Sequence, residues 1–253
     1  MSFIADLHIH SSYSIATSRD ISPETIYKWA QLKGVTVLGT GDLTHPSWIS
    51  ELKEKLEPAG NGLFRLKKKY RGIDREVPNP CKGEVNFLLS SEISCIYKKG
   101  GKVRKVHNLV YMPGFEEAER LNRELGKIGN LKGDGRPILG LDSKELLRMA
   151  LDISPDSVLV PAHAWTPWFS VFGSRSGFNS LEECFEELTP HIHAIETGLS
   201  SDPPMNWRVS SLDNITLISN SDAHSPQKIG REANIFDTEL SYSGIMGGIK
   251  DGK

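Results

Sequence analysis

Two short polar strings stand near opposite ends of the chain, and each follows an apolar run that predicts a β-strand. The first is Asp6-Leu7-His8-Ile9-His10, and the second is Ser221-Asp222-Ala223-His224. Residues i and i+2 of a strand point to the same face. Each H-x-H or D-x-H pair can therefore aim two ligand atoms at one point, which predicts a metal site assembled from the first strand and a late one.

The length fits one large α/β domain or two small ones, and we predict a single domain over residues 1–253. Hydrophobic residues make up 38% of the chain, and the net charge is −2. No apolar run approaches the roughly 18 residues of a membrane span, and no secretion signal is seen at the start. Cys81, Cys95 and Cys184 lack C-x-x-C spacing, which argues against a disulfide framework or a cysteine zinc site. We expect a cytoplasmic protein with no membrane partner.

Basic residues are segregated into two clusters, at 65–71 and 98–105. Such a distribution can offer a positive surface to phosphates even when the net charge is near zero. Lys98, Lys99 and Arg104 of the second cluster are therefore candidates for substrate contact. The alternative is that both clusters are solvated faces of loops and helices.

Apolar, β-branched runs alternate with amphipathic segments along the chain. The runs are 3–9, 35–40, 85–96, 106–111, 157–162, 193–197, 215–219 and 234–236. The helical patterns are 22–33, 47–56, 115–128, 143–150 and 180–188. This order predicts parallel βα units, for which closure as a barrel is the natural architecture. Residues 60–84 and 96–106 are predicted insertions, the second a hairpin with a turn at Lys-Lys-Gly-Gly-Lys.

Polar residues collect at the ends of these runs, where a βα barrel places its active site. The candidate ligands are His8, His10, Asp42, His45, Glu92, His107, His163, Asp222 and His224. Imidazole and carboxylate ligands suit Zn, Mn, Fe or Mg, and their number implies two or three divalent ions, an arrangement that cleaves phosphate esters. Glu92 and Asp222 are equally placed to bridge ions or to orient water.

Some of these residues have structural alternatives. A lone histidine such as His107 is often a satisfied core residue, and His45 is equally open to either role. His191 and His193 follow Pro190, and we expect them to be structural or exposed. Gly39 and Gly41 are expected to let the backbone approach the metal site.

The segment 163–177 combines aromatic and small residues with one arginine. Trp165, Trp168, Ser174 and Arg175 suit stacking on a base and binding a phosphate. The alternative is a packed lid whose aromatic rings belong to the core. Ser201 follows another strand and is expected to line the same cleft.

The ligand pattern resembles that of the PHP (polymerase and histidinol phosphatase) family. The resemblance implies a distorted βα barrel of about seven units with a trinuclear metal centre. Its ligands would be His8, His10, Asp42, Glu92, His107, His163, Asp222 and His224, with Glu92, Asp222 and His224 as catalytic residues. Thr40-Gly41-Asp42 departs from the usual T-D-H, and Asp20 is the candidate for the remaining first-loop ligand.

Within that family the chain is most similar to the endonuclease Q branch. The matching strings are ADLHIHSSYSIATS, VLGTGDLTHPSW, FGSRSGFNSLEECF, AIETGLSSDPPMNWR and TLISNSDAHSPQKIGREANIFD. The resemblance implies cleavage of damaged DNA on the 5′ side of a deaminated or abasic nucleotide, with other repair or replication proteins as further partners. Members carry a cysteine-rich C-terminal portion, so the resemblance also implies a shortened chain.

Two other functions are compatible with the same ligands. One is a small-molecule phosphoesterase of the histidinol-phosphatase kind. The other is a non-catalytic PHP module in which the metals only stabilise the fold. The basic clusters and the long matching strings favour the nuclease.

Overall fold

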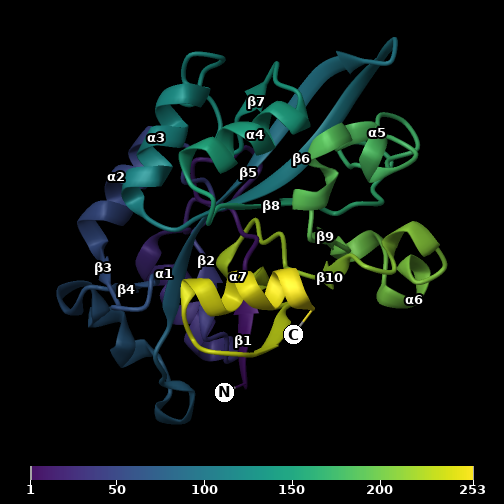
Figure 1. Ribbon diagram of the computed structural model, residues 1–253. Helices are drawn as coiled ribbons and strands as arrows, with labels where there is room; N and C mark the ends of the chain where they lie inside the picture. The colour runs from purple at the N-terminus through teal and green to yellow at the C-terminus, as the bar shows by residue number, and fades with distance from the viewer. Residues whose placement is uncertain (1, 253) are drawn as a thin grey trace.

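Strands and helices alternate along the chain in the computed structural model, which describes residues 2–252 (Figure 1). The strands are β1 (Ser2–Asp6), β2 (Val37–Gly39), β3 (Leu56–Pro58), β4 (Phe64–Leu66), β5 (Asn86–Lys99), β6 (Lys102–Met112), β7 (Ile138–Leu139), β8 (Val158–Pro161), β9 (Ala194–Glu196), β10 (Thr216–Ile218) and β11 (Asn234–Asp237). The α-helices are α1 (Pro23–Lys33), α2 (Pro46–Lys55), α3 (Phe115–Leu125), α4 (Ser143–Ile153), α5 (Leu181–Phe185), α6 (Pro203–Asn206) and α7 (Tyr242–Asp251). Short 3₁₀ helices are Lys68–Glu76, Asn79–Cys81, Glu186–His191, Gly198–Ser200, Ser210–Leu212 and Pro226–Lys228.

The strands form a nine-stranded sheet and a separate parallel pair of β9 and β10. Strands β1, β2 and β5 are parallel neighbours, as the alternating pattern predicts. Strand β6 instead runs antiparallel to both β5 and β8. The reason is the turn at Gly100 and Gly101, whose φ angles of 58° and 73° allow a two-residue hairpin and return the chain beside β5. The predicted hairpin is thus confirmed, and it extends beyond the other strands (Figure 1).

Two further contacts link strand ends that the sheet leaves unpaired. Ile9 forms a parallel bridge with Ala223, and His10 N–H donates to the Ala223 carbonyl at 3.0 Å. Beyond β8, Ala164 N–H donates to the Glu196 carbonyl at 2.8 Å. The carboxyl ends of these strands therefore surround a common centre. The α/β class is confirmed, while a fully closed barrel and the insertion status of 60–84 and 96–106 stay predictions.

Local signals in the sequence explain where several helices begin and end. Ser22 caps α1 by accepting a hydrogen bond from Thr25 N–H, and Gly34 ends the helix with φ 71°. Ser180 caps α5, which ends at Phe185 and continues as a 3₁₀ helix to His191. No helix among residues 2–252 has the length and apolar content of a membrane span.

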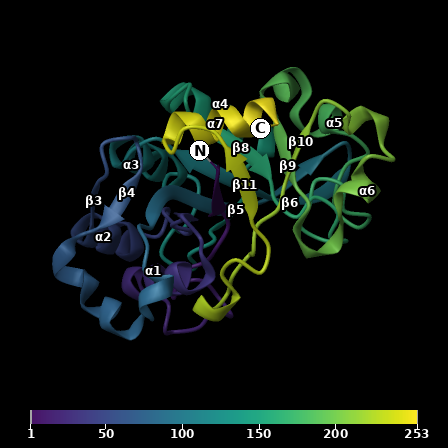
Figure 2. The same cartoon turned by 90° about the horizontal axis from the view of Figure 1, so that it is seen from below.

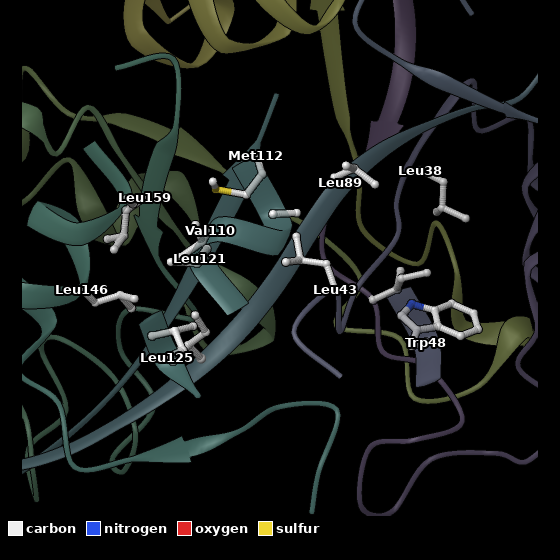
Figure 3. Packing of buried hydrophobic residues seen from close by; sticks show 14 of the residues in the cluster. Leu38, Leu43, Trp48, Leu89, Val110, Met112, Leu121, Leu125, Leu146 and Leu159 are labelled. Atoms are coloured by element: carbon white, nitrogen blue, oxygen red, sulfur yellow. The ribbon is translucent and has the colours of Figure 1, made fainter. Parts of the chain in front are cut away.

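Two apolar clusters hold the layers together. In the larger one, Trp48 of α2 and Leu121 of α3 pack against the sheet (Figure 3). In the smaller one, Phe3 of β1 packs with Ile245 and Ile249 of α7, and α7 lies beside β10 and β11 (Figure 2). Helix α7 therefore covers the side where β1 begins, and the carboxyl ends of the strands are left for polar side chains.

Candidate metal centre

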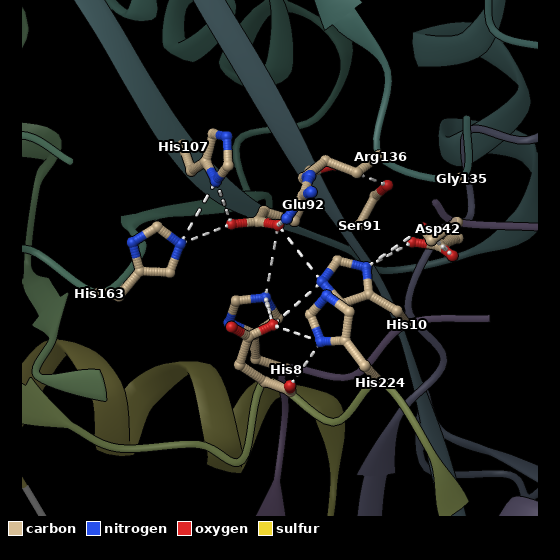
Figure 4. A network of polar contacts seen from close by, with 12 residues as sticks. His8, His10, Asp42, Ser91, Glu92, His107, Gly135, Arg136, His163 and His224 are labelled. Atoms are coloured by element: carbon tan, nitrogen blue, oxygen red, sulfur yellow. Dashed lines mark hydrogen bonds and ion pairs between the residues drawn. The ribbon is translucent and has the colours of Figure 1, made fainter. Parts of the chain in front are cut away.

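The predicted ligands converge on one centre (Figure 4). His8 and His10 follow β1, His163 follows β8, and Asp222 and His224 follow β10, whereas Glu92 and His107 lie within β5 and β6. Three groups have ligand atoms that all lie within 4.8 Å of one another; they are His8 with His10 and Glu92, His10 with Asp222 and His224, and Glu92 with His107 and His163. Of the eight ligands that the PHP resemblance implies, each except Asp42 belongs to a group. The groups share His10 and Glu92, which makes them parts of one site.

Glu92 joins two of these groups through its two oxygens. Oε1 lies 2.8 Å from His107 Nδ1 and 2.9 Å from His163 Nε2. Oε2 lies 3.4 Å from His10 Nε2 and accepts a hydrogen bond from Arg136 Nη1 at 3.1 Å. A buried carboxylate that faces ligands on both sides has the geometry of a bridge between ions.

His8 supplies the test of whether metal ions fit this site. Its Nδ1 lies 3.0 Å from both carboxylate oxygens of Glu196, so Nδ1 carries the proton and donates it. Its Nε2 is buried and has no hydrogen-bond partner, and lies 3.5 Å from Asp222 and 3.7 Å from Glu92. A buried imidazole nitrogen without a partner is costly. A lone pair that faces two carboxylates fits a divalent cation between them.

Asp42 is placed behind His10 and lies outside the three groups. Its Oδ1 lies 3.1 Å from His10 Nδ1. Its Oδ2 accepts hydrogen bonds from the backbone N–H and hydroxyl of Ser11, both at 2.6 Å, and from the Ser14 hydroxyl at 2.8 Å. Asp42 is thus placed to orient His10, and its predicted role as a direct ligand stays a prediction.

Glu196 was not among the residues predicted from the sequence. It ends β9 and is fully buried. It accepts hydrogen bonds from Asn220 Nδ2 and from the backbone N–H of His163, each at 2.9 Å, besides the one from His8. The signal that would have identified it is the one used elsewhere, a carboxylate that ends an apolar run. Arg136 was missed as well, because it lies in a loop without such a pattern.

The charges of the site shift the pKa values of its members. Burial lowers the pKa of His8, but the charges of Glu196, Asp222 and Glu92 outweigh it and raise the pKa well above the usual value. For the Glu92 carboxyl the directions are reversed. Burial raises its pKa, but the imidazoles, first His107 and then His8, hold the pKa well below the usual range. The carboxylates thus require nearby positive charge, which protons on the imidazoles or divalent cations can provide.

Backbone conformation at the site is unusual. Asp42, His163 and Asp222 have φ angles of 45°, 30° and 47°, in the left-handed region that costs non-glycine residues free energy. Gly41 has φ 61°, and a Cβ there would lie 2.2 Å from the Ile9 carbonyl oxygen. The prediction that this glycine lets the backbone approach the site is confirmed.

Lys99 and Arg104, two predicted substrate residues, are engaged elsewhere. Lys99 Nζ donates to the Cys184 carbonyl at 2.8 Å and pairs with Asp142 and Glu186. Arg104 lies 4.1 Å from the ring centre of Phe178 and donates to the Gly177 carbonyl. Both cations thus fasten the hairpin to the neighbouring segment, because carboxylates and carbonyls there satisfy them. Lys98 is exposed near the hairpin turn.

The aromatic segment is partly packed and partly exposed. Trp165 is half-buried, and its Nε1 donates to Asn206 Oδ1 at 2.8 Å, while Trp168 is 51% exposed. Ser174 and Arg175 are exposed. Trp165 therefore fits the packed-lid alternative, whereas substrate contact by Trp168, Ser174 and Arg175 stays a prediction.

The remaining candidates lie outside the three groups. His45 stacks on Tyr13 with ring centres 4.3 Å apart, and Asp20 is exposed in the loop before α1. Ser201 donates to the Thr197 carbonyl at 3.0 Å. His191 and His193, expected to be structural or exposed, belong to none of the groups.

Comparison with known proteins finds relatives that are longer than this chain, and no family model matches it. The uncharacterized protein YqxK of Bacillus subtilis is 30% identical over 248 residues, which cover 91% of this chain and 57% of that protein. The uncharacterized protein MJ0043 of Methanocaldococcus jannaschii is 31% identical over 163 residues, which cover 64% of this chain and 16% of that protein. The chain thus spans little more than half the length of these relatives at most.

Solved structures give a close match over almost the whole chain. The lesion-specific endonuclease PfuEndoQ from Pyrococcus furiosus is 31% identical with a TM-score of 0.82, covering 99% of this chain and 56% of its own. Endonuclease Q in complex with a 27-mer duplex that has an abasic lesion at the active site gives 31% identity and a TM-score of 0.83, covering 99% of this chain and 57% of its own.

A third structure shares the fold at lower identity. A putative metal-dependent phosphoesterase from Bifidobacterium adolescentis is 13% identical with a TM-score of 0.56, covering 90% of this chain and 91% of its own. The similarity to endonuclease Q, predicted from the matching strings, is therefore confirmed over almost the whole chain, and the fold is shared with a phosphoesterase.

Proposed function

We propose that this chain, which has the fold of endonuclease Q, is a metal-dependent endonuclease that hydrolyses DNA on the 5′ side of a damaged nucleotide. The observation that carries the proposal is the set of three ligand groups sharing His10 and Glu92, on a fold whose solved counterpart has an abasic lesion at its active site. The chain spans 57% of that counterpart, so both substrate and cleavage position are inferred from similarity.

The three groups would hold two or three divalent ions, with Zn, Mn, Mg and Fe all compatible with imidazole and carboxylate ligands. Bound at such a site, divalent ions lower the pKa of water and offset negative charge on the reacting oxygens. Glu196 and Asp42 would hold His8 and His10 through Nδ1, so that each Nε2 faces the centre.

The exposure of the two central carboxylates supports different roles for them. The Glu92 side chain is fully buried, whereas that of Asp222 is 29% exposed. Glu92 would therefore hold ions on both of its sides, and Asp222 would orient the attacking water and accept its proton. The His224 ring donates from Nδ1 to the Asp222 carbonyl at 2.9 Å, which leaves Nε2 free to bind. Attack of water on phosphorus would break the bond to the 3′ oxygen, leaving a 3′-hydroxyl and a 5′-phosphate.

The test is a nicking assay with purified chain, Mn²⁺ or Mg²⁺, and an end-labelled duplex containing one deoxyuridine or abasic site. We expect a nick 5′ to the lesion that is absent from an unmodified duplex, in the presence of a chelator and in the Asp222→Ala variant. Hydrolysis of p-nitrophenyl phosphate without nicking would indicate a small-molecule phosphoesterase. Tight metal binding without either reaction would indicate a non-catalytic module.

A further inference from the structure

The segment that follows β8 is fastened to β6 next to two of the ligands. His107 N–H donates to the Phe169 carbonyl at 3.0 Å, and Lys105 N–H donates to the Ser176 carbonyl at 3.2 Å. The Thr166 hydroxyl lies 3.2 Å from His163 Nδ1 and donates to the Trp168 carbonyl at 2.8 Å. These contacts fix the position of Trp168 and Phe169 relative to the metal centre.

Lys105 lies on the site face of β6. Because side chains alternate along a strand, Lys105 shares a face with His107 two residues later. The Lys105 ammonium lies 5.1 Å from the ring centre of Trp168 and 5.2 Å from that of Phe169. The Phe169 ring in turn lies 4.8 Å from the His107 ring. A continuous row of side chains therefore connects this ammonium to the Glu92 group.

The charge of Lys105 is not neutralised by the protein. Within the described residues 2–252, no carboxylate lies within ion-pair distance of Lys105, whereas Lys99 on the same hairpin contacts both Asp142 and Glu186. Aromatic rings attract an ammonium through their faces but leave its charge available to a phosphate. Trp168 remains 51% exposed beside it, which leaves ring surface for stacking.

We propose that Lys105 and Trp168 form a subsite for the damaged strand, in which Lys105 binds a phosphate flanking the scissile one and Trp168 stacks on a base. The inference rests on the proposed function and names the chemistry of a neighbouring part of the same site. The Lys105 ammonium can bind a phosphate whatever the base sequence of the DNA, and Trp168 supplies a flat apolar surface for a base. Together they suit single-stranded or unstacked nucleic acid.

The experiment compares Lys105→Ala with Lys102→Ala, which removes the same charge from the opposite face of β6, and with Trp168→Ala. Binding of lesion-containing and unmodified duplexes is measured at several salt concentrations, together with cleavage and Mn²⁺ binding. We expect Lys105→Ala to weaken DNA binding by about three- to tenfold at 0.1 M salt and to reduce the slope of log K against log salt by about 0.9.

The other variants should behave differently. Trp168→Ala should lose at least about fivefold in binding of the lesion duplex with an unchanged salt slope, and Trp168→Phe should recover part of it. Mn²⁺ binding should stay at the wild-type level in all variants, which shows that the metal centre is folded. Equal DNA binding by Lys105→Ala and Lys102→Ala would overturn the subsite alone, whereas a wild-type chain that neither binds nor cuts damaged DNA would overturn both proposals.

Discussion

Replacement of Glu196 by Gln places an amide where every neighbour donates a hydrogen bond. The carboxylate accepts from His8 Nδ1, Asn220 Nδ2 and the His163 backbone N–H. Whichever oxygen becomes the NH₂ group, that group faces His8 together with either Asn220 or His163. If His8 shifts its proton from Nδ1 to Nε2 to accept from the amide, its metal-facing nitrogen loses the lone pair.

The effect of the amide on stability and its effect on metal affinity each have a predictable size. A buried donor left facing another donor costs about 1–3 kcal/mol of unfolding free energy. Loss of the partner that orients a histidine ligand typically lowers metal affinity by about 10–100-fold, or roughly 1.4–2.7 kcal/mol. Because Glu196 also accepts a hydrogen bond from the backbone N–H of His163, we expect the loss of metal affinity in Glu196→Gln to lie in the upper part of the roughly 10–100-fold range.

Calorimetric titration with Mn²⁺ and urea unfolding in chelator measure the two effects separately. Glu182→Gln is the matched control, because it removes the same charge from an exposed position in α5. Wild-type Mn²⁺ affinity in Glu196→Gln, at unchanged unfolding free energy, would refute the assigned role of Glu196.

Other variants and conditions test further parts of the site. Asp222→Ala should reduce cleavage below detection while changing the unfolding free energy in chelator by no more than about 1 kcal/mol, since the side chain is partly exposed; cutting at the wild-type rate would contradict the assignment. Gly41→Ala should destabilise by at least about 1–2 kcal/mol in urea, because its Cβ would approach the Ile9 carbonyl and its φ is positive; an unchanged midpoint would contradict this. His8 and His10 have raised pKa values in the folded state, so in chelator their stabilisation should be fully present below about pH 6.5 and be lost as the pH rises through those values. Mn²⁺ affinity should change in the opposite direction and increase with pH, because bound protons compete with the metal; pH-independent affinity would contradict the shifts.

The residues that the sequence identified are those whose geometry is local. The i, i+2 alternation of a strand is enough to predict that His8 and His10 face one point, as the structure shows. The same holds for His163, which follows the apolar run of β8, whereas Glu92 lies within β5. These arrangements depend on strand geometry more than on distant contacts, which is why sequence alone could reveal them.

What the sequence did not reveal depends on contacts between distant segments. The cluster around Lys99 predicts a free positive surface, but Asp142 and Glu186 neutralise this lysine from more than 40 positions away. Arg136 reaches Glu92 from a loop with no periodic pattern. The reversed direction of β6, by contrast, follows from the predicted hairpin, because a two-residue Gly-Gly turn requires antiparallel strands.

The contact between His10 and Asp222 joins residues 212 positions apart at 3.1 Å. An ion held by this pair would act on the chain as a non-covalent cross-link between its first and last parallel strands. By the chain-entropy relation for cross-links, closing a loop of that length lowers the conformational entropy of the unfolded ensemble. The loss raises the free energy of the unfolded state by about 5 kcal/mol. Metal loading should therefore protect β1 and β10 from local opening and proteolysis together, and the centre is complete only after the segments that follow β1 and β10 have come together.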